Sequence, residues 1–173
     1  MTEFDANAMP SDAGADHQPA PTAAGEDPLL ALLIQLLKLS SLISAPMKVG
    51  VCDPAEVSTN EVKVLMALAG EGPLAGHDLV EIMGTPPMNV SRALAALKAR
   101  GWVEEAQDPE NRRRRPVRLT IEGEGAYARL LPHVARVAGA LLGKLTQRQQ
   151  REMAHLVGLV LGRMAEWGPP EKD

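Results

Sequence analysis

Apolar residues recur at helical spacing along most of the chain, and this pattern predicts a mainly α-helical protein. The first such stretch, "LLALLIQLLKLSSLI" over residues 29–43, is apolar on nearly every side. A helix of this kind needs burial on more than one side, so in a chain this small we expect a second subunit to cover it. Gln35, Lys38 and two serines interrupt the apolar stretch 28–44, which argues against a membrane span.

Two short helices with distinct end signals are predicted next. Ser58 and Glu61 stand at capping-box spacing and predict the start of a helix that ends at Gly70 or Gly72. The stretch "PLAGHDLVEIMG" predicts a second helix that ends at Gly84. Its expected core residues are Leu79, Ile82 and Met83.

A third helix is predicted in "TPPMNVSRALAALKARG", with Thr85 as its N-cap and Gly101 at its end. Its helical period places Val90, Leu94 and Leu97 on the core side. The opposite side carries small and polar residues, which suit a helix that lies in the major groove of DNA. The candidate DNA contacts at this helix are Thr85, Met88, Asn89, Ser91, Arg92, Ala95 and Lys98. The alternative is an ordinary exposed helix face.

The apolar period changes to alternation after the third helix. Residues 102–107, "WVEEAQ", and 116–120, "PVRLT", predict two strands, and Pro116 suits the start of an edge strand. The loop between the strands projects positive charge, and the narrow minor groove of DNA attracts inserted arginine. The candidate contacts in this loop are Arg112, Arg113, Arg114 and Arg115. The alternative is a solvated run of charge, which fits a tail better than the tip of a hairpin.

Two long helices are predicted in the C-terminal part. Thr120 is expected to cap the first of them, and Pro132 is expected to bend it. The apolar stripe of that helix consists of Tyr127, Leu130, Val134, Val137 and Leu141. The last helix runs from about Thr146 to Glu166. Its apolar residues are Met153, Leu156, Val157, Val160, Leu161 and Met164.

The net charge of −4 hides a basic segment. Residues 85–120 hold eight bases and four acids, whereas residues 1–54 hold two bases and seven acids. A basic segment in an acidic protein is typical of a nucleic-acid-binding surface. The single cysteine, Cys52, excludes an internal disulfide and favours a reducing cytoplasm.

The order of three helices, a short hairpin and flanking long helices is that of a winged helix-turn-helix domain. With "NVSRALAALKARGWVEEAQDPENRRRRPVRLT" at its centre, the stretch from about Val57 to Gly125 resembles the MarR family of bacterial transcription regulators. The Leu-rich first helix and the last two helices are similar to the dimerisation region of that family. The resemblance covers all but the N-terminal tail and the extreme C-terminus, and it implies a homodimer that binds double-stranded DNA.

The resemblance also implies roles for individual residues. Ser91 and Arg92 match recognition-helix positions that touch DNA, and Arg113 matches the wing arginine that enters the minor groove. Asp108 matches the acid that opens the wing motif, whereas residues 110–111, Glu and Asn, depart from the Arg and Asp that are usual there.

Members of the family respond to aromatic acids, CoA thioesters or oxidants, so the resemblance implies an effector site. The candidate residues are Ser40, Ser41, His133 and Arg136, although His133 also fits a solvated or core-edge histidine. Cys52 fits an ordinary thiol better than a redox switch. The histidines lack metal-ligand spacing and no catalytic constellation stands out, so we expect no metal, no cofactor and no enzyme activity.

These observations predict a mainly α fold with a small β-hairpin wing, in four segments. They are a disordered tail over 1–27, a dimerisation helix and linker over 28–54, a winged helix-turn-helix region over 55–120, and C-terminal dimerisation helices over 121–173. The expected function is a cytoplasmic repressor that leaves a pseudo-palindromic operator when a small molecule binds. The alternative is a winged-helix interaction module whose basic wing binds acidic protein partners.

Overall fold

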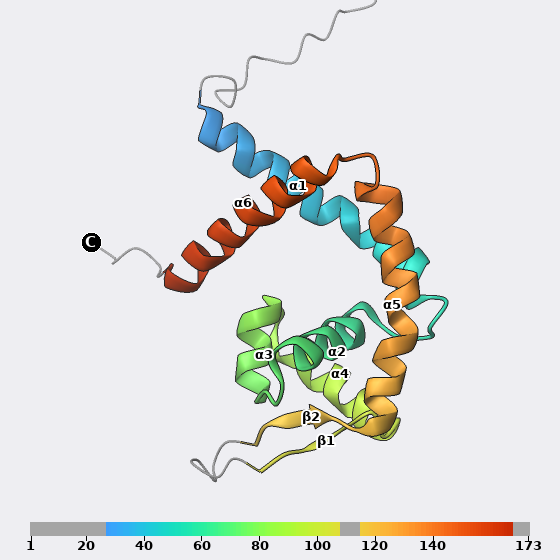
Figure 1. Cartoon of the computed structure of the whole chain (residues 1–173). Coiled ribbons are helices and arrows are strands. Elements are labelled where there is room, and N and C mark those ends of the chain that lie inside the picture. Colours follow the sequence, from blue (N-terminus) through green and yellow to red (C-terminus); the bar gives the residue numbers. More distant parts are fainter. Residues whose placement is uncertain (1–26, 108–114, 168–173) are drawn as a thin grey trace, which may run out of the picture. The chain divides into compact units, whose positions relative to one another are not determined.

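The computed structural model describes residues 27–107 and 115–167, which form helices and one short hairpin (Figure 1). This confirms the predicted fold class. The elements are α1 (Pro28–Met47), η2 (Lys48–Cys52), α2 (Thr59–Glu71), α3 (Gly76–Met83), α4 (Pro87–Ala99), β1 (Val103–Glu105), β2 (Val117–Leu119), α5 (Ile121–Leu142) and α6 (Gln147–Glu166). The chain divides into two compact units, residues 1–41 and 42–173, and each is described by itself.

α1 is a long apolar helix in which no residue is buried. It continues past Ile43 to Met47 and then, as the π-helix η2, to Cys52. The linker expected within 28–54 is therefore mostly helical, because the apolar residues continue beyond the two serines. By length and composition alone, the helical segment Pro28–Cys52 could also span a membrane. Composition therefore does not distinguish a membrane-spanning helix from a helix that packs against another protein surface.

The core of the larger unit lies between α2, α3 and α4. Leu65, Leu79 and Leu97, one from each helix, are completely buried. The predicted capping box of α2 is present, since the Glu61 amide donates to the Ser58 hydroxyl (3.2 Å) and the Ser58 amide donates to the Glu61 carboxylate (2.8 Å). These local bonds fix where α2 begins.

α3 ends where its sequence predicts, at Gly84 in the left-handed conformation (φ 54°). Leu79 is in the core, but the prediction for Ile82 was wrong, because 52% of that residue is exposed. Met83 packs against the core as predicted, and Val80, which was not predicted, packs there too. A helix of eight residues is too short for its apolar pattern to fix which side faces inward.

The start of α4 differs from the prediction by one residue. Pro86 is the N-cap, with no capping side chain, and Pro87 is the first helical residue. Thr85 is buried and its hydroxyl donates to the Met83 carbonyl (3.1 Å), so its assignment as N-cap was wrong. The reason is steric, because a residue before proline is pushed out of the helical region, and both Thr85 and Pro86 precede a proline.

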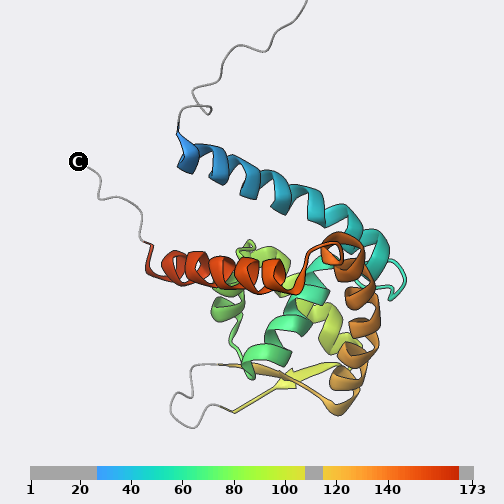
Figure 2. The same ribbon diagram turned by 45° about the horizontal axis from the view of Figure 1, so that its top comes forward.

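β1 and β2 form an antiparallel pair (Figure 2). In this pair Glu104 lies opposite Arg118. Val117 of β2 also exchanges two backbone hydrogen bonds with Leu74, of 2.8 and 3.0 Å. β2 is thus an edge strand of a two-stranded sheet, as expected from Pro116, and it has one isolated bridge to Leu74 on its other side. Pro116 precedes the paired residues, so its missing N–H leaves no ladder bond unmade.

α5 starts at the predicted cap and packs on the rest of the unit. The Thr120 hydroxyl accepts from the Gly123 amide (3.0 Å) and donates to the Gly101 carbonyl (2.7 Å). Leu130 and Val137 of the expected stripe are buried, whereas Leu141 is exposed. Pro132 lies inside the helix, which continues to Leu142.

α6 follows a second capping box, formed by Thr146 and Gln149 as expected for a start near Thr146. All of its residues whose side chains are described are exposed, including the predicted apolar stripe from Met153 to Met164. An exposed apolar helix of this length indicates a surface that another protein surface covers.

Candidate nucleic-acid interface

The exposed side of α4 carries most of the candidate DNA contacts. Met88, Ser91, Arg92, Ala95 and Lys98 are exposed, and Asn89 is half-buried. Arg92 forms no hydrogen bond or ion pair with the described residues, so its guanidinium is available to a ligand. Thr85 belongs to the same set of candidates, but its burial removes its side chain from this surface.

An open groove of about 590 Å³ runs between α3 and α4. Ser91, Ala95 and Lys98 line it from α4, and His77 and Val80 line it from α3. The groove shows that nothing in the described part of the chain covers this side of α4, as a helix that enters the major groove requires.

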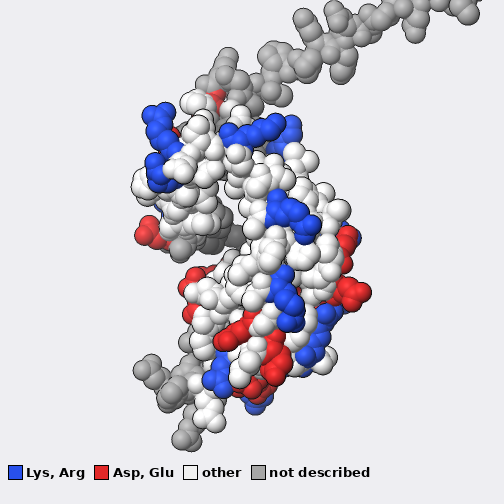
Figure 3. Space-filling model, turned by 45° about the vertical axis from the view of Figure 1, so that its right-hand side comes forward, with Lys and Arg blue, Asp and Glu red and all other residues white. Residues whose placement is uncertain are grey.

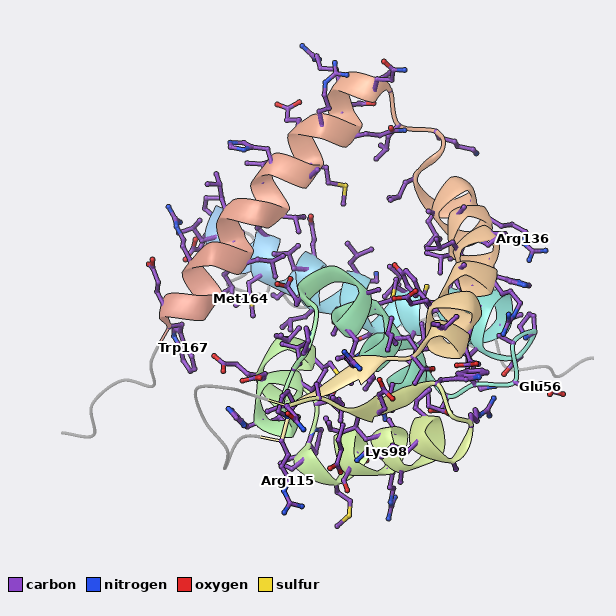
Figure 4. All side chains as sticks on the ribbon, turned by 60° about the horizontal axis from the view of Figure 1, so that its bottom comes forward. Glu56, Lys98, Arg115, Arg136, Met164 and Trp167 are labelled. Carbon is purple, nitrogen blue, oxygen red and sulfur yellow. The ribbon has the colours of Figure 1, made fainter. Side chains whose placement is uncertain are left out.

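The outer side of α4 is connected to the hairpin by an ion pair. Lys98 Nζ lies 2.8 Å from Oε1 of Glu105, the last residue of β1. The hydrogen bond from Lys98 is the main reason that the pKa of Glu105 lies below its usual range, and the positive charge of Arg115 lowers it a little further. Lys98, Glu105 and Arg115 therefore form one charged cluster, and Figure 4 shows Lys98 and Arg115 on the side of the unit where α4 lies.

Residues 108–114 are not described, so four of the predicted wing residues lie outside the described part of the chain: Asp108, Arg112, Arg113 and Arg114. Their contacts with DNA stay predictions. Arg115 is described and exposed, next to the buried Pro116. Since Ala106 N–H donates to the Pro116 carbonyl (2.8 Å), Arg115 directly precedes the paired part of the hairpin.

Charges of both signs lie close together on the face shown in Figure 3. Among the described residues, a nitrogen of Arg118 and an oxygen of Glu104 on the neighbouring strand are 2.8 Å apart. Arg118 is therefore engaged, whereas Arg92 has no such partner among the described residues. The sequence could not distinguish these arginines, because pairing depends on strand register.

The effector candidates fall into two pairs. The Ser40 and Ser41 hydroxyls in α1 both lie within hydrogen-bond distance of the Leu37 carbonyl (3.2 and 3.0 Å), which is the usual arrangement for serine inside a helix. On α5, Arg136 Nη2 lies 2.7 Å from Nδ1 of His133. The two α5 residues thus contact each other, as their helical spacing allows.

Two further features bear on the expected chemistry. Cys52 is buried, with its sulfur 3.7 Å from the Thr59 hydroxyl, and it does not take part in the surface described above. Among residues 27–107 and 115–167, no three His, Cys, Asp or Glu side chains gather as a metal site would require.

Comparison with known proteins assigns this arrangement to a family. A sequence profile of the MarR family matches residues 56–114, from the start of α2 to the hairpin. The transcriptional regulator HosA of Escherichia coli O111:H- is 29% identical over 102 residues, which are 59% of this chain and 76% of HosA. The matched segment is a MarR family domain. The chain is similar to transcriptional regulators of that family and has a winged-helix fold.

Solved MarR structures share the fold well beyond the matched segment. A MarR family regulator from Silicibacter pomeroyi DSS superposes with a TM-score of 0.75 at 18% identity, covering 85% of this chain and all of that one. Bordetella bronchiseptica BpsR, whose DNA binding is regulated by 6-hydroxynicotinic acid, superposes with a TM-score of 0.63 at 21% identity, covering 75% of this chain and 98% of BpsR. At these identities the likeness establishes the fold alone.

Proposed function

We propose that this protein is a homodimeric repressor that binds a pseudo-palindromic operator and leaves it when a small molecule binds. The observation that carries the proposal is the ion pair between Lys98 and Glu105, because it joins the outer side of α4 to the hairpin that carries the arginines. One duplex can then contact both, with α4 in the major groove and the hairpin in the adjacent minor groove.

Each proposed DNA contact has a distinct task. Ser91 and Arg92, in the N-terminal half of α4, are placed to reach base edges, and Ala95 lets the helix lie close to the bases. Lys98 and the hairpin arginines, Arg113 above all, contact phosphates and the minor groove. Sequence preference should therefore depend on Arg92, and overall affinity on the hairpin.

The apolar surfaces of α1 and α6 support a homodimer. Leu156, Leu161 and Met164 of α6 and its C-cap residue Trp167 each expose more than half of their surface. In α1, Leu29 exposes 75% and Leu37 exposes 59%. Soluble monomers rarely expose apolar patches of this size, and a second copy of the chain would cover them.

The proposed effector is a small aromatic carboxylate. Support comes from BpsR, a protein of the same fold that responds to an aromatic acid, and from the basic residues His133 and Arg136 on α5. A CoA thioester, the second class that the family resemblance implies, stays a prediction.

Salt-dependent gel shifts with the DNA upstream of the protein's own gene test the proposal. Arg113→Ala should weaken binding to all DNA sequences and lower the salt slope by about one phosphate contact. Arg92→Ala should change sequence preference. If neither variant changes DNA affinity, the result favours the alternative function, in which the basic hairpin binds acidic protein partners.

A further inference from the structure

Arg100, the C-cap of α4, connects three parts of the larger unit. Its Nη2 donates to the Glu56 carbonyl (2.7 Å), and its Nε lies 3.6 Å from Oε1 of Glu61. Its guanidinium carbon lies 4.9 Å from the centre of the Trp102 ring. One side chain thus holds the end of the recognition helix to the segment that leads from η2 into α2.

These contacts leave the guanidinium only partly engaged. Oε1 of Glu61 is buried and has no hydrogen-bond partner among the described residues, because 3.6 Å is too long for a hydrogen bond. Glu56 has a φ of 53°, a left-handed conformation that a residue other than glycine keeps only where its surroundings hold it. Arginine has five N–H donors, so Arg100 retains donors for another anion.

A hollow of about 340 Å³ opens next to Arg100, between α5 and the loop before α2. Its apolar side includes the buried Leu130 and the half-buried Trp102, and its basic side chains are Arg100, Arg129 and His133. We call it the Arg100 hollow. Its volume is within the range of small-molecule sites, and a basic rim over an apolar wall matches a small organic anion.

Two donors of the rim are unused by the described part of the chain. Arg129 is exposed and forms no hydrogen bond or ion pair with a described residue. Arg136 donates to Nδ1 of His133, and since arginine has no acceptor, a neutral His133 carries its proton on Nε2. Nε2 is then a donor as well. Figure 4 shows Glu56 and Arg136 on the same side of α5.

We propose that the Arg100 hollow binds a small organic carboxylate, which replaces the Glu56 carbonyl as the hydrogen-bond acceptor of the Arg100 guanidinium. This inference rests on the proposed function, and it names the place and the chemistry of the effector site. The carboxylate accepts a bidentate pair of hydrogen bonds from Arg100 and further bonds from Arg129 and His133. The Glu56 carboxylate also borders the hollow and opposes the binding of an anion.

The proposed binding has a direct consequence for α4. Once Arg100 pairs with the ligand, the end of α4 is no longer tied to the segment before α2. The Glu56 loop also loses the side-chain bond that helps to hold its left-handed residue. The orientation of the recognition helix can then change, which weakens its fit to the operator.

Tryptophan fluorescence of the full-length Trp167→Phe variant tests the binding step, because Trp102 is then the only tryptophan. Benzoate is the probe and benzamide its neutral control. Benzoate should give a saturable change and benzamide none. Arg129→Gln should weaken benzoate binding about tenfold or more, as expected when a charged hydrogen bond is lost. Glu56→Gln should strengthen it, and Arg151→Gln, an exposed change on α6, should leave it unaltered.

The outcomes separate cleanly. Arg100→Gln should also lose benzoate binding. If circular dichroism shows that this variant is unfolded, the test depends on Arg129→Gln alone. The site is overturned by the absence of a saturable response to benzoate, by equal affinity in Arg129→Gln, or by equal binding of benzamide. If saturating benzoate leaves the DNA affinity of the wild type unchanged, the proposed link to α4 is overturned. Failure of the proposed function would show differently, as no DNA binding in the absence of benzoate.

Discussion

Lys98 on α4 and Glu105 on β1 lie 2.8 Å apart, so the C-terminal part of α4 lies beside the hairpin. The same pair limits the positive charge that the surface offers to DNA, since the Lys98 ammonium donates a hydrogen bond to the Glu105 carboxylate. DNA phosphates and Glu105 therefore compete for Lys98.

Replacing Glu105 by glutamine should raise DNA affinity, because Lys98 becomes available and a negative charge leaves the surface. We expect a gain of a few-fold, similar for all DNA sequences, with a salt slope steeper by about one phosphate contact. Fluorescence anisotropy at several salt concentrations measures both. Glu104→Gln is the matched control, since its carboxylate pairs with Arg118 instead and alternation along β1 turns it to the other face. A gain in the control equal to that of Glu105→Gln would contradict the competition.

The pKa of Glu105 should rise when Lys98 is replaced by alanine, because the hydrogen bond that lowers it is lost. A carboxyl whose folded pKa is lowered adds stability above its unfolded pKa and loses it as the pH falls through the lowered value. The Lys98–Glu105 pair should therefore be intact at neutral pH and break only in acid. Carboxyl NMR titration of wild type and Lys98→Ala measures the shift, and an unchanged Glu105 pKa would refute the pairing.

Gly123 should tolerate no larger residue, because a Cβ there would overlap the Trp102 carbonyl oxygen. That oxygen also accepts a hydrogen bond from the Thr120 amide (3.1 Å). The backbone at Trp102 therefore cannot shift without breaking this hydrogen bond between the hairpin and the start of α5. We expect Gly123→Ala to destabilise the fold by about 1–3 kcal/mol or more. Urea denaturation measures this. Gly139→Ala in the same helix has open space and should stabilise slightly or not at all.

The exposed apolar side of α6 should be needed for self-association. Leu161→Glu together with Met164→Glu should shift the protein toward monomer, because a homodimer interface would bury these charges. Sedimentation velocity across a concentration series measures the change, with Arg148→Gln as an exposed control on the same helix. A wild type that is already monomeric at all concentrations would contradict the proposed dimer.

Local patterns predicted the elements closely where the decisive contacts are close in sequence. The caps Ser58 and Thr120, the helix start near Thr146 and the stop at Gly84 lie where the sequence predicts. Each depends on backbone groups within a few residues. Thr85 was misplaced because two prolines changed the backbone that a cap requires.

The remaining features depend on contacts between distant residues. Arg100 and Glu56 are 44 positions apart, and no local pattern relates an arginine after a helix to a carbonyl in a loop. The pairing of Val117 with Leu74 likewise arises only when the chain returns to α3, which is why β2 gains a second partner. The Arg100 hollow could not be found from sequence for the same reason.

The central claim is that one duplex contacts the outer side of α4 and the hairpin together. Site-directed cleavage tests it most directly, with an iron chelate attached to Ser91→Cys or to Arg115→Cys, while the buried Cys52 of the unaltered chain is the control. The account predicts cleavage from both positions within one half-site, about half a helical turn apart. Cleavage from only one position, or at unrelated places on the DNA, would contradict it.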